Sequence, residues 1–459
     1  LGKSNETPVV AWTVAARQPG TIWIGSNKGL YRLGSERNDQ EIFLNDPADP
    51  NSIVDNNIWC LLPDPSGFIW AGTNGGISKT NIAQAVFQLI NADPGKRVTL
   101  SSSKVTAILE DNSGYLWVGT DGGGLNCIDP QRKKNTVYTM SNSELQNDNI
   151  WALTEDKKGN IWIGNYQGGL HIFSRSAGKI KAFPGRPGDP KSLSNNRVLA
   201  LIADRDGAIW IGTRGGGLIR FDPETSVFRS FLHSAKDSSS ISGNTVLSLA
   251  TDNKGRLWAG TFEGGLNLYF PETGKLRSLR KKAGDNSSLS NYNIWSILFD
   301  KKDRLWIGTQ GGLNYSYKPG GNMVFSYLSS RDGLKSNTIF GLAEDAMGNI
   351  WMSNFNGLTR LDIKTFESAG KAGTDNSGFS PFHPLFRMFD SDHGLQGPEF
   401  NQGAYHKGHS GLLYFGGTNG LNYFSTEDVK ESNYLPPVVI TGMKVFNKEV
   451  AIIPSDGLV

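Results

Sequence analysis

The sequence is poor in the residues from which catalytic and metal sites are usually built. Its 459 residues include only two cysteines, Cys60 and Cys127, and six histidines. The cysteines form no CxxC pair and have no histidine at a metal-like spacing, so we expect free thiols and no metal site. His406 and His409 lie three residues apart, and we expect them to be solvated turn residues. No nucleophile with its base, no carboxylate pair and no Walker or Rossmann spacing is apparent, which predicts no catalytic residues and no cofactor.

Charge of one sign and long apolar runs are also lacking. Lys and Arg number 46 against 43 Asp and Glu, a net charge of +3, and both signs are scattered along the chain. Nothing therefore indicates a nucleic-acid partner. No stretch reaches about 18 consecutive apolar residues, so we expect these residues not to insert into a membrane. Because the chain opens with Leu1 and shows no signal-peptide profile, we expect a processed or excised piece of a longer protein.

Glycine and tryptophan, by contrast, are abundant and regularly placed. The 56 glycines follow no strict every-third-residue period, which excludes collagen and favours a turn-rich all-β chain. Eight of the 12 tryptophans recur every 45 to 48 residues, and the other four each lie 11 residues before one of them. The recurring eight are Trp23, Trp70, Trp117, Trp162, Trp210, Trp258, Trp306 and Trp351. A ninth, degenerate copy spans residues 413–421, with Tyr414 in the tryptophan position. Such a period is typical of propeller blades.

Each repeat is interpreted as four short strands. In the third copy, residues 105–109 alternate toward a turn at 111–114, where Asp111 and Gly114 suit a type I turn. A second strand at 115–120 meets the glycine cluster 122–124, and a third strand starts at Leu125. Because a lone small sheet cannot bury both of its faces, four antiparallel strands per repeat predict an all-β fold, a β-propeller of stacked blades. We expect the recurring tryptophans to pack between blades.

The number of blades depends on the two ends of the repeat array. Residues 86–90 form an isolated apolar strand after the second copy, whereas the ninth copy lacks an outer strand before Pro436 and Pro437. We therefore expect residues 86–90 to complete the last blade and to close a seven-bladed ring over residues 85–434. Residues 1–84 would be two additional blades, the end of an upstream propeller. A single ring of eight or nine blades is the alternative.

The repeat units resemble those of a known family. Residues 209–218, IWIGTRGGGL, and 305–309, LWIGT, resemble two-component regulator propeller repeats, which build the extracytoplasmic sensor region of bacterial hybrid histidine kinases. Residues 392–404, DHGLQGPEFNQGA, resemble the segment that closes the second propeller of that family. Residues 436–447, PPVVITGMKVFN, resemble the start of its triple-tyrosine domain. The resemblance thus implies that residues 435–459 begin a truncated immunoglobulin-like β-sandwich.

The resemblance implies a sensor and no enzyme in these residues. The family's membrane helix, kinase and response regulator are not in the sequence. The implied function is recognition of an oligosaccharide or polysaccharide breakdown product by the periplasmic, extracytoplasmic part of an inner-membrane receptor. Such a receptor would pass the signal to a kinase, with homodimerisation through downstream parts. A protein-interaction or structural platform is the alternative. A glycan lyase or hydrolase is a third hypothesis, and it would need acid and base groups that converge on the channel.

Propeller geometry places the candidate ligand-binding residues on one face. If the Asp-x-x-Gly turns lie on one face, the turns after the second strands and the residues that lead into the innermost strands share the opposite one, around the channel mouth. Aromatic, Asn, Gln and Arg side chains there could stack on and hydrogen-bond sugar rings. The candidates are Asp121, Tyr166, Arg214, Phe262, Glu263, Gln310 and Phe355 from the turns, with Arg197 and Tyr292 from the lead-in positions. Trp59, Trp151 and Trp295 begin innermost strands and could be core or rim.

Overall fold

The regular secondary structure of the described residues is almost entirely antiparallel β-strand, so the predicted all-β class is confirmed. The computed structural model describes residues 8–16, 21–34, 40–47, 52–64, 68–81, 86–183, 185, 192–317, 323–371, 385–429, 443–445 and 448–450. The chain divides into two compact units, which are Ala85–Val429, and Leu1–Gln84 with Lys430–Val459.

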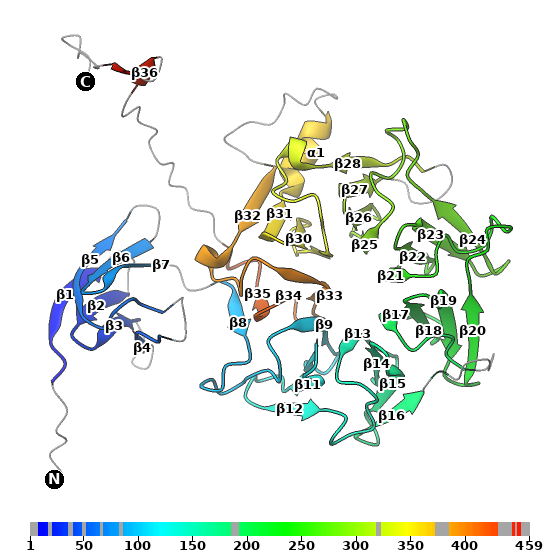
Figure 1. Ribbon diagram of the computed structural model, residues 1–459, viewed down its shortest axis with the longest axis horizontal. Coiled ribbons are helices and arrows are strands. Elements are labelled where there is room, and N and C mark those ends of the chain that lie inside the picture. Colours follow the sequence, from blue (N-terminus) through cyan, green and yellow to red (C-terminus); the bar gives the residue numbers. More distant parts are fainter. Residues whose placement is uncertain are drawn as a thin grey trace. The chain divides into compact units, whose positions relative to one another are not determined.

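Within its described residues, the unit Ala85–Val429 contains seven four-stranded sheets arranged as the blades of a ring (Figure 1). This confirms the predicted seven-bladed propeller. From the innermost strand outwards, blade 1 is β9 (Val105–Glu110), β10 (Leu116–Thr120), β11 (Leu125–Ile128) and β12 (Asn135–Tyr138); blade 2 is β13 (Ile150–Glu155), β14 (Ile161–Asn165), β15 (Gly169–Ser174) and β16 (Lys179–Phe183); blade 3 is β17 (Val198–Ala203), β18 (Ile209–Thr213), β19 (Leu218–Asp222) and β20 (Val227–Phe231); blade 4 is β21 (Val246–Thr251), β22 (Leu257–Thr261), β23 (Gly265–Phe270) and β24 (Lys275–Leu279).

The remaining blades follow the same order with two additions. Blade 5 is β25 (Ile294–Phe299), β26 (Leu305–Thr309), β27 (Gly312–Ser316) and β28 (Ser326–Leu328); blade 6 is β29 (Gly341–Glu344), β30 (Ile350–Asn354), β31 (Gly357–Leu361) and β32 (Phe386–Phe389); blade 7 is β33 (Phe400–Lys407), β34 (Leu413–Gly417), β35 (Gly420–Phe424) and β8 (Gln88–Ile90). The additions are the helix α1 (Ile363–Lys371), between β31 and β32, and 3-10 turns at Ser330–Asp332 and Ser391–His393.

Blade 7 is completed by a strand from the start of the unit. Strand β8 pairs antiparallel with β35, in a register that sets Ile90 opposite Leu421. Just before β8, the Phe87 side chain is 3% exposed and packs edge-on against Phe424, with ring centres 4.6 Å apart. The prediction that residues 86–90 supply this strand is confirmed, and strand pairing joins the two ends of the ring.

The second strand of every blade is buried along its length because neighbouring blades cover both of its faces. Its tryptophan is between 0 and 3% exposed in blades 1 to 6, which confirms packing between blades. The turn before this strand closes as predicted, with Gly114 N–H donating to the Asp111 carbonyl at 2.8 Å. In blade 5 Asp303 replaces the turn glycine and adopts φ 60°, a left-handed conformation that Asp tolerates better than most residues.

The other unit holds three further sheets among its described residues, two of them in Leu1–Gln84. Strands β1 (Ala11–Ala16), β2 (Ile22–Ser26), β3 (Gly29–Leu33) and β4 (Gln40–Phe43) form one, and β5 (Ile58–Pro63), β6 (Phe68–Thr73) and β7 (Gly76–Asn81) form the other. Trp59 stacks on Trp12 with ring centres 4.1 Å apart and is 52% exposed, so it is not a core residue. Strands β36 (Met443–Val445) and β37 (Lys448–Val450) pair with each other. The rest of the predicted immunoglobulin-like start lies outside the described residues.

Candidate functional site

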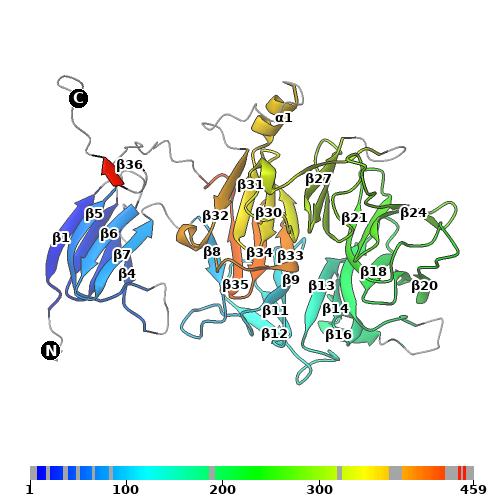
Figure 2. The ribbon, with the colours of Figure 1, turned by 45° about the horizontal axis from the view of Figure 1, so that its top comes forward.

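The channel mouth is built from residues that the backbone anchors in pairs. The innermost strands, among them β9, β13, β17 and β21, surround the centre of the ring (Figure 1), and the strands run between its two faces (Figure 2). On one face, the N–H of Tyr166 donates to the Asn149 carbonyl and that of Arg214 to the Arg197 carbonyl, both at 2.9 Å. The same bond recurs in blades 1 and 4. In blades 1 to 4, the turn after the second strand therefore lies beside the residue that leads into the innermost strand.

Tyr166, Arg197 and Arg214 come together at this mouth. Arg214 Nη1 donates to the Tyr166 hydroxyl at 2.6 Å, and the guanidinium carbons of Arg197 and Arg214 lie 5.8 and 6.0 Å from the Tyr166 ring centre. Trp151 stacks on the same ring at 5.0 Å, with an interplanar angle of 26°. Backbone bridges link Tyr166 with Arg197 and Arg214 with Thr245, so three neighbouring blades hold this cluster in place.

An aromatic row continues across blades 4, 5 and 6. Phe262 packs edge-on against Trp295 at 6.4 Å, Trp295 against Phe340 at 5.7 Å, and Phe340 against Phe355 at 4.6 Å. Phe262 and Phe355 are 40% and 52% exposed, whereas Phe340 is 7% exposed. The row therefore offers apolar ring surface to solvent at its ends and is supported from beneath in its middle.

The other predicted residues lie around these two clusters. The Glu263 N–H donates to Asn293 Oδ1 at 2.7 Å, and Asn293 Nδ2 donates to Gln310 Oε1 at 3.0 Å. Asp121 forms an ion pair with Lys104, which leads into β9 in the same blade. Tyr292 is 43% exposed, and its carbonyl accepts the N–H of Gly265 at 2.9 Å. Asp121 comes from blade 1 and Glu263 from blade 4.

Sequence reasoning missed two mouth residues, Phe340 and Lys104. Phe340 occupies the same repeat position as Trp151 and Trp295. An alignment of the repeats could therefore have identified it. Trp151 and Trp295 sit where the pairing of the first two strands shifts, a β-bulge that turns a side chain away from the regular ladder. Both are half-buried rim residues, and each Nε1 is buried with no acceptor among the described residues.

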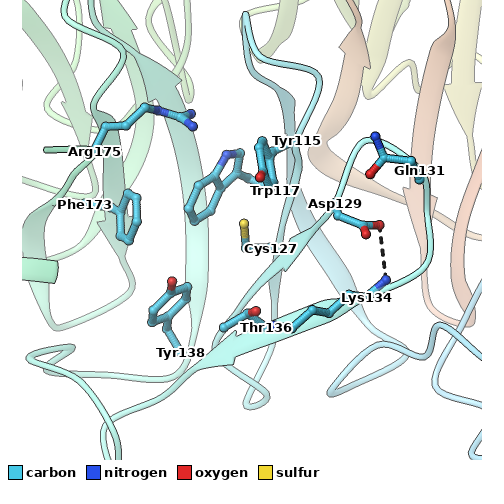
Figure 3. Close-up of a pocket in the computed structure, with 10 residues that line it drawn as sticks. All are labelled: Tyr115, Trp117, Cys127, Asp129, Gln131, Lys134, Thr136, Tyr138, Phe173 and Arg175. Atoms are coloured by element: carbon cyan, nitrogen blue, oxygen red, sulfur yellow. Dashed lines mark hydrogen bonds between the residues drawn. The ribbon is translucent and has the colours of Figure 1, made fainter. Parts of the chain in front are cut away.

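A second concavity lies between blades 1 and 2, with a volume of about 440 Å³ (Figure 3). Cys127 and Thr136 stand in the cross-strand row of Trp117, where blades 2, 3, 4 and 6 carry longer side chains. Those longer pairs are Ile172 with Lys181, Arg220 with Arg229, Leu268 with Arg277, and Arg360 with Arg387.

Arg175, Asp129 and Cys127 of this pocket are already paired, hydrogen-bonded or neutral. Arg175 pairs with the buried Asp111, and its Nε donates to the Gly159 carbonyl at 2.9 Å. Burial raises the pKa of the Cys127 thiol to about 12, so it stays protonated at neutral pH. In Figure 3 Asp129 accepts the N–H of Lys134, at 3.1 Å. The mouth, with its exposed rings and arginines, is therefore the stronger candidate site.

One expectation for the histidines was wrong. His406 lies in β33 with its ring against Tyr414, 6.4 Å between centres, and burial lowers its pKa to about 4. It is therefore a strand residue packed in the ring and not a solvated turn histidine. Both cysteines are free, as expected. Within the described ranges, no group of three or more His, Cys, Asp or Glu residues is placed to hold a metal ion. No helix that the structure describes has both the length and the apolar character to cross a bilayer.

The stretches of this chain that match a known family fall on the repeat units described above. Six stretches match the two component regulator propeller, at residues 52–75, 99–122, 144–167, 192–215, 240–263 and 288–311. In the ring, each match runs from the lead-in to an innermost strand through the turn after the second strand, and the matches include the predicted mouth residues except Phe355. These six stretches of the chain are similar to two-component regulator propeller repeats. The matched stretches therefore carry most of the core tryptophans and most of the candidate site, whereas Trp351, Phe340 and Phe355 lie outside them.

Solved and curated relatives agree with these regulator propeller repeats. The extracellular domain of BT3049, a hybrid two component system of B. thetaiotaomicron, is 25% identical, with a TM-score of 0.72 over 96% of this chain and 56% of that domain. The extracellular domain of BT4673 from the same organism shares the fold, at 20% identity and a TM-score of 0.59 over 97% of this chain and 57% of that one. Histidine kinase P4 of Formosa agariphila is 26% identical over 121 residues, 26% of this chain and 8% of the kinase. The chain spans little more than half of the solved domains.

Proposed function

We propose that this chain is the ligand-sensing, extracytoplasmic propeller of a two-component receptor, and that it binds an oligosaccharide or polysaccharide breakdown product at the channel mouth. The observation that carries the proposal is the aromatic row Phe262, Trp295, Phe340 and Phe355, which presents exposed rings beside amide side chains. Sugar rings have apolar faces that stack on aromatic rings and hydroxyls that need hydrogen-bond partners.

The polar surroundings of the row suit such a ligand. Asn293 and Gln310 stand beside the turn of Phe262, and their amides can donate to and accept from hydroxyl groups. The buried indole N–H of Trp295 has no acceptor among the described residues. A sugar oxygen or a bridging water at this point would satisfy a donor that is otherwise costly to leave unpaired.

The sensor role is supported by the relatives, whose homologous regions are extracellular domains of two-component systems. A periplasmic location in an inner-membrane receptor and signalling to a kinase dimer through downstream parts follow by analogy. Binding alone would not transmit a signal, because a ligand shifts an equilibrium only by its difference in affinity for two states. The proposal therefore requires the occupied mouth to favour one of two receptor conformations.

Thermal unfolding of the whole chain against a panel of neutral and acidic oligosaccharides tests this function. A ligand that binds only the folded state raises the midpoint in a dose-dependent way. We expect Trp295→Ala and Phe355→Ala to abolish the shift, and Tyr327→Ala, an aromatic of similar exposure on the outer strand β28, to preserve it. No shift with any oligosaccharide, from a protein that melts cooperatively, would instead favour the protein-interaction platform.

A further inference from the structure

Two arginines of the mouth lie beside a single tyrosine without a counter-charge. Arg197 and Arg214 are both exposed, and neither forms an ion pair with a carboxylate of the described residues. Three arginines elsewhere in the ring pair with acids. Arg175 pairs with Asp111, Arg256 with Asp252, and Arg304 with Asp300 and Glu367. The mouth thus concentrates positive charge that the fold itself does not neutralise.

Backbone contacts hold Arg197 and Arg214 next to each other. The Arg214 N–H donates to the Arg197 carbonyl, and the backbone bridge of Tyr166 with Arg197 joins blades 2 and 3. The Tyr166 hydroxyl holds Arg214 through one of the five N–H donors that a guanidinium carries. Each arginine therefore keeps a forked set of donors suited to a carboxylate or a sulfate.

This basic pair adjoins the aromatic row. Arg214 bridges Thr245 through the backbone, and the Thr245 carbonyl accepts the Phe262 N–H at 2.9 Å. Phe262 is the first ring of the row. One ligand can therefore stack on the row and reach the arginines, and Trp151, stacked on Tyr166, adds a buried indole N–H without an acceptor among the described residues.

We infer that the ligand is an acidic oligosaccharide, whose oxyanion, a carboxylate or a sulfate ester, is bound by Arg197 and Arg214 beside Tyr166. The inference rests on the proposed function, because it assigns the charge of a ligand for the same mouth. Hydrogen bonds between a guanidinium and an oxyanion are about twice as strong as neutral ones, so the charged group contributes much of the affinity and decides between glycans.

The experiment measures the binding of matched pairs of oligosaccharides to the whole chain by calorimetry. One pair is a galacturonic acid tetrasaccharide and its methyl ester, and the other is a sulfated galactan tetrasaccharide and its desulfated form. We expect one acidic member to bind at least about tenfold more tightly than its neutral partner, since one charge-assisted contact has that value. The pair that shows the difference identifies the oxyanion. The preference should shrink between about 50 mM and about 500 mM salt.

Variants locate the site. Arg197→Gln and Arg214→Gln are expected to remove the preference for the acidic member, and Arg214→Lys should keep only part of it because a lysine lacks the fork. Arg205→Gln is the matched control, since Arg205 is an exposed arginine of blade 3 in the Asp-x-x-Gly turn between β17 and β18. Thermal melts check that each variant folds.

The remaining outcomes separate the two proposals. Equal binding of acidic and neutral members would overturn the acidic ligand and leave the sugar-binding mouth standing. A preference that survives both arginine variants would also overturn it. Absence of binding by all four oligosaccharides, where the broader panel also gives no thermal shift, would overturn the proposed function and the inference with it. Where the panel does give a shift with neutral sugars alone, only the acidic ligand is overturned.

Discussion

Trp351 donates its indole N–H to Asp345 Oδ2 at 3.0 Å, although both residues are almost completely buried. The aspartate is the first residue of the turn that precedes the tryptophan's strand, six residues earlier in the chain. The same bond recurs in other repeats as Asp64 with Trp70, Asp111 with Trp117, Asp156 with Trp162, Asp204 with Trp210, Asp252 with Trp258 and Asp300 with Trp306. The aspartate thus ties its turn to the interblade core.

Replacing this aspartate should destabilise the ring. Asp345 Oδ1 also accepts the backbone N–H groups of Met347 and Asn349 at 2.9 Å, so Asp345→Ala leaves several buried donors unpaired. We expect a loss of about 2–4 kcal/mol in the free energy of unfolding, measured by urea denaturation. Asp206→Ala, at an exposed position of the corresponding turn in blade 3, is the control. Equal stability of the two variants would contradict this role.

Much of the ring could be predicted because the repeat is periodic and its partners are local. The tryptophan spacing, the Asp-x-x-Gly turns and the isolated strand at 86–90 are all visible in one sequence, and each has a single place in a closed ring. Blade 7 departs from the pattern, since Tyr414 replaces the tryptophan and its hydroxyl accepts from Arg132 at 2.9 Å. That contact joins residues 282 positions apart, which no local pattern contains.

The candidate site was less predictable because it depends on how side chains of neighbouring blades meet. Repeat geometry placed Tyr166, Arg197 and Arg214 at one face, but their convergence on one ring depends on rotamers and on the bulge at Trp151. Phe340 escaped notice because Trp, Phe, Leu and Thr alternate at its repeat position, so no single residue type marks the rim. His406 shows the same limit, since its burial comes from neighbouring strands and not from its spacing to His409.

Two glycines after the second strands should tolerate no valine. Gly265 has φ 92°, a conformation unfavourable for a β-branched residue, and a Cβ at Gly216 would lie 2.5 Å from the Cβ of Asn195. We expect Gly265→Val and Gly216→Val to lose about 1–3 kcal/mol each, whereas Arg214→Ala, which removes an exposed side chain, should leave the thermal midpoint nearly unchanged. Thermal melts of the three variants test this ranking of stabilities. The ranking would be overturned if Arg214→Ala proved the least stable.

The closing strand should carry much of the ring's stability. Phe87 fills a cluster with Phe424, Phe389 and Trp351, with ring centres 4.6, 5.3 and 6.4 Å away. Phe87→Ala leaves a cavity there and should cost about 3–5 kcal/mol, measured by urea denaturation. Phe262→Ala, which removes a 40% exposed ring from the mouth, is the matched control and should cost far less. Similar losses would mean that β8 contributes little to closure.

Glu344 should make the ring respond to mild acid in an unusual direction. It ends β29, and its two carboxylate oxygens accept the Lys301 N–H of the preceding blade at 3.2 and 3.3 Å. Burial raises its pKa above the ordinary 4.5, an effect that the hydrogen bond and the nearby Lys407 only partly offset. A folded-state pKa above the unfolded one means that this group stabilises the fold when protonated and loses that contribution as pH rises through the folded pKa.

Glu344→Gln therefore should melt at or above the wild-type temperature at pH 7, because the amide oxygen still accepts the Lys301 N–H without a buried charge. Toward pH 4 the wild-type carboxyl becomes protonated, and the two midpoints should converge. Glu272→Gln, at an exposed position before β24, controls for the general effect of removing a negative charge. A Glu344→Gln variant clearly less stable than wild type at pH 7 would show instead that attraction to Lys407 outweighs desolvation at this blade interface.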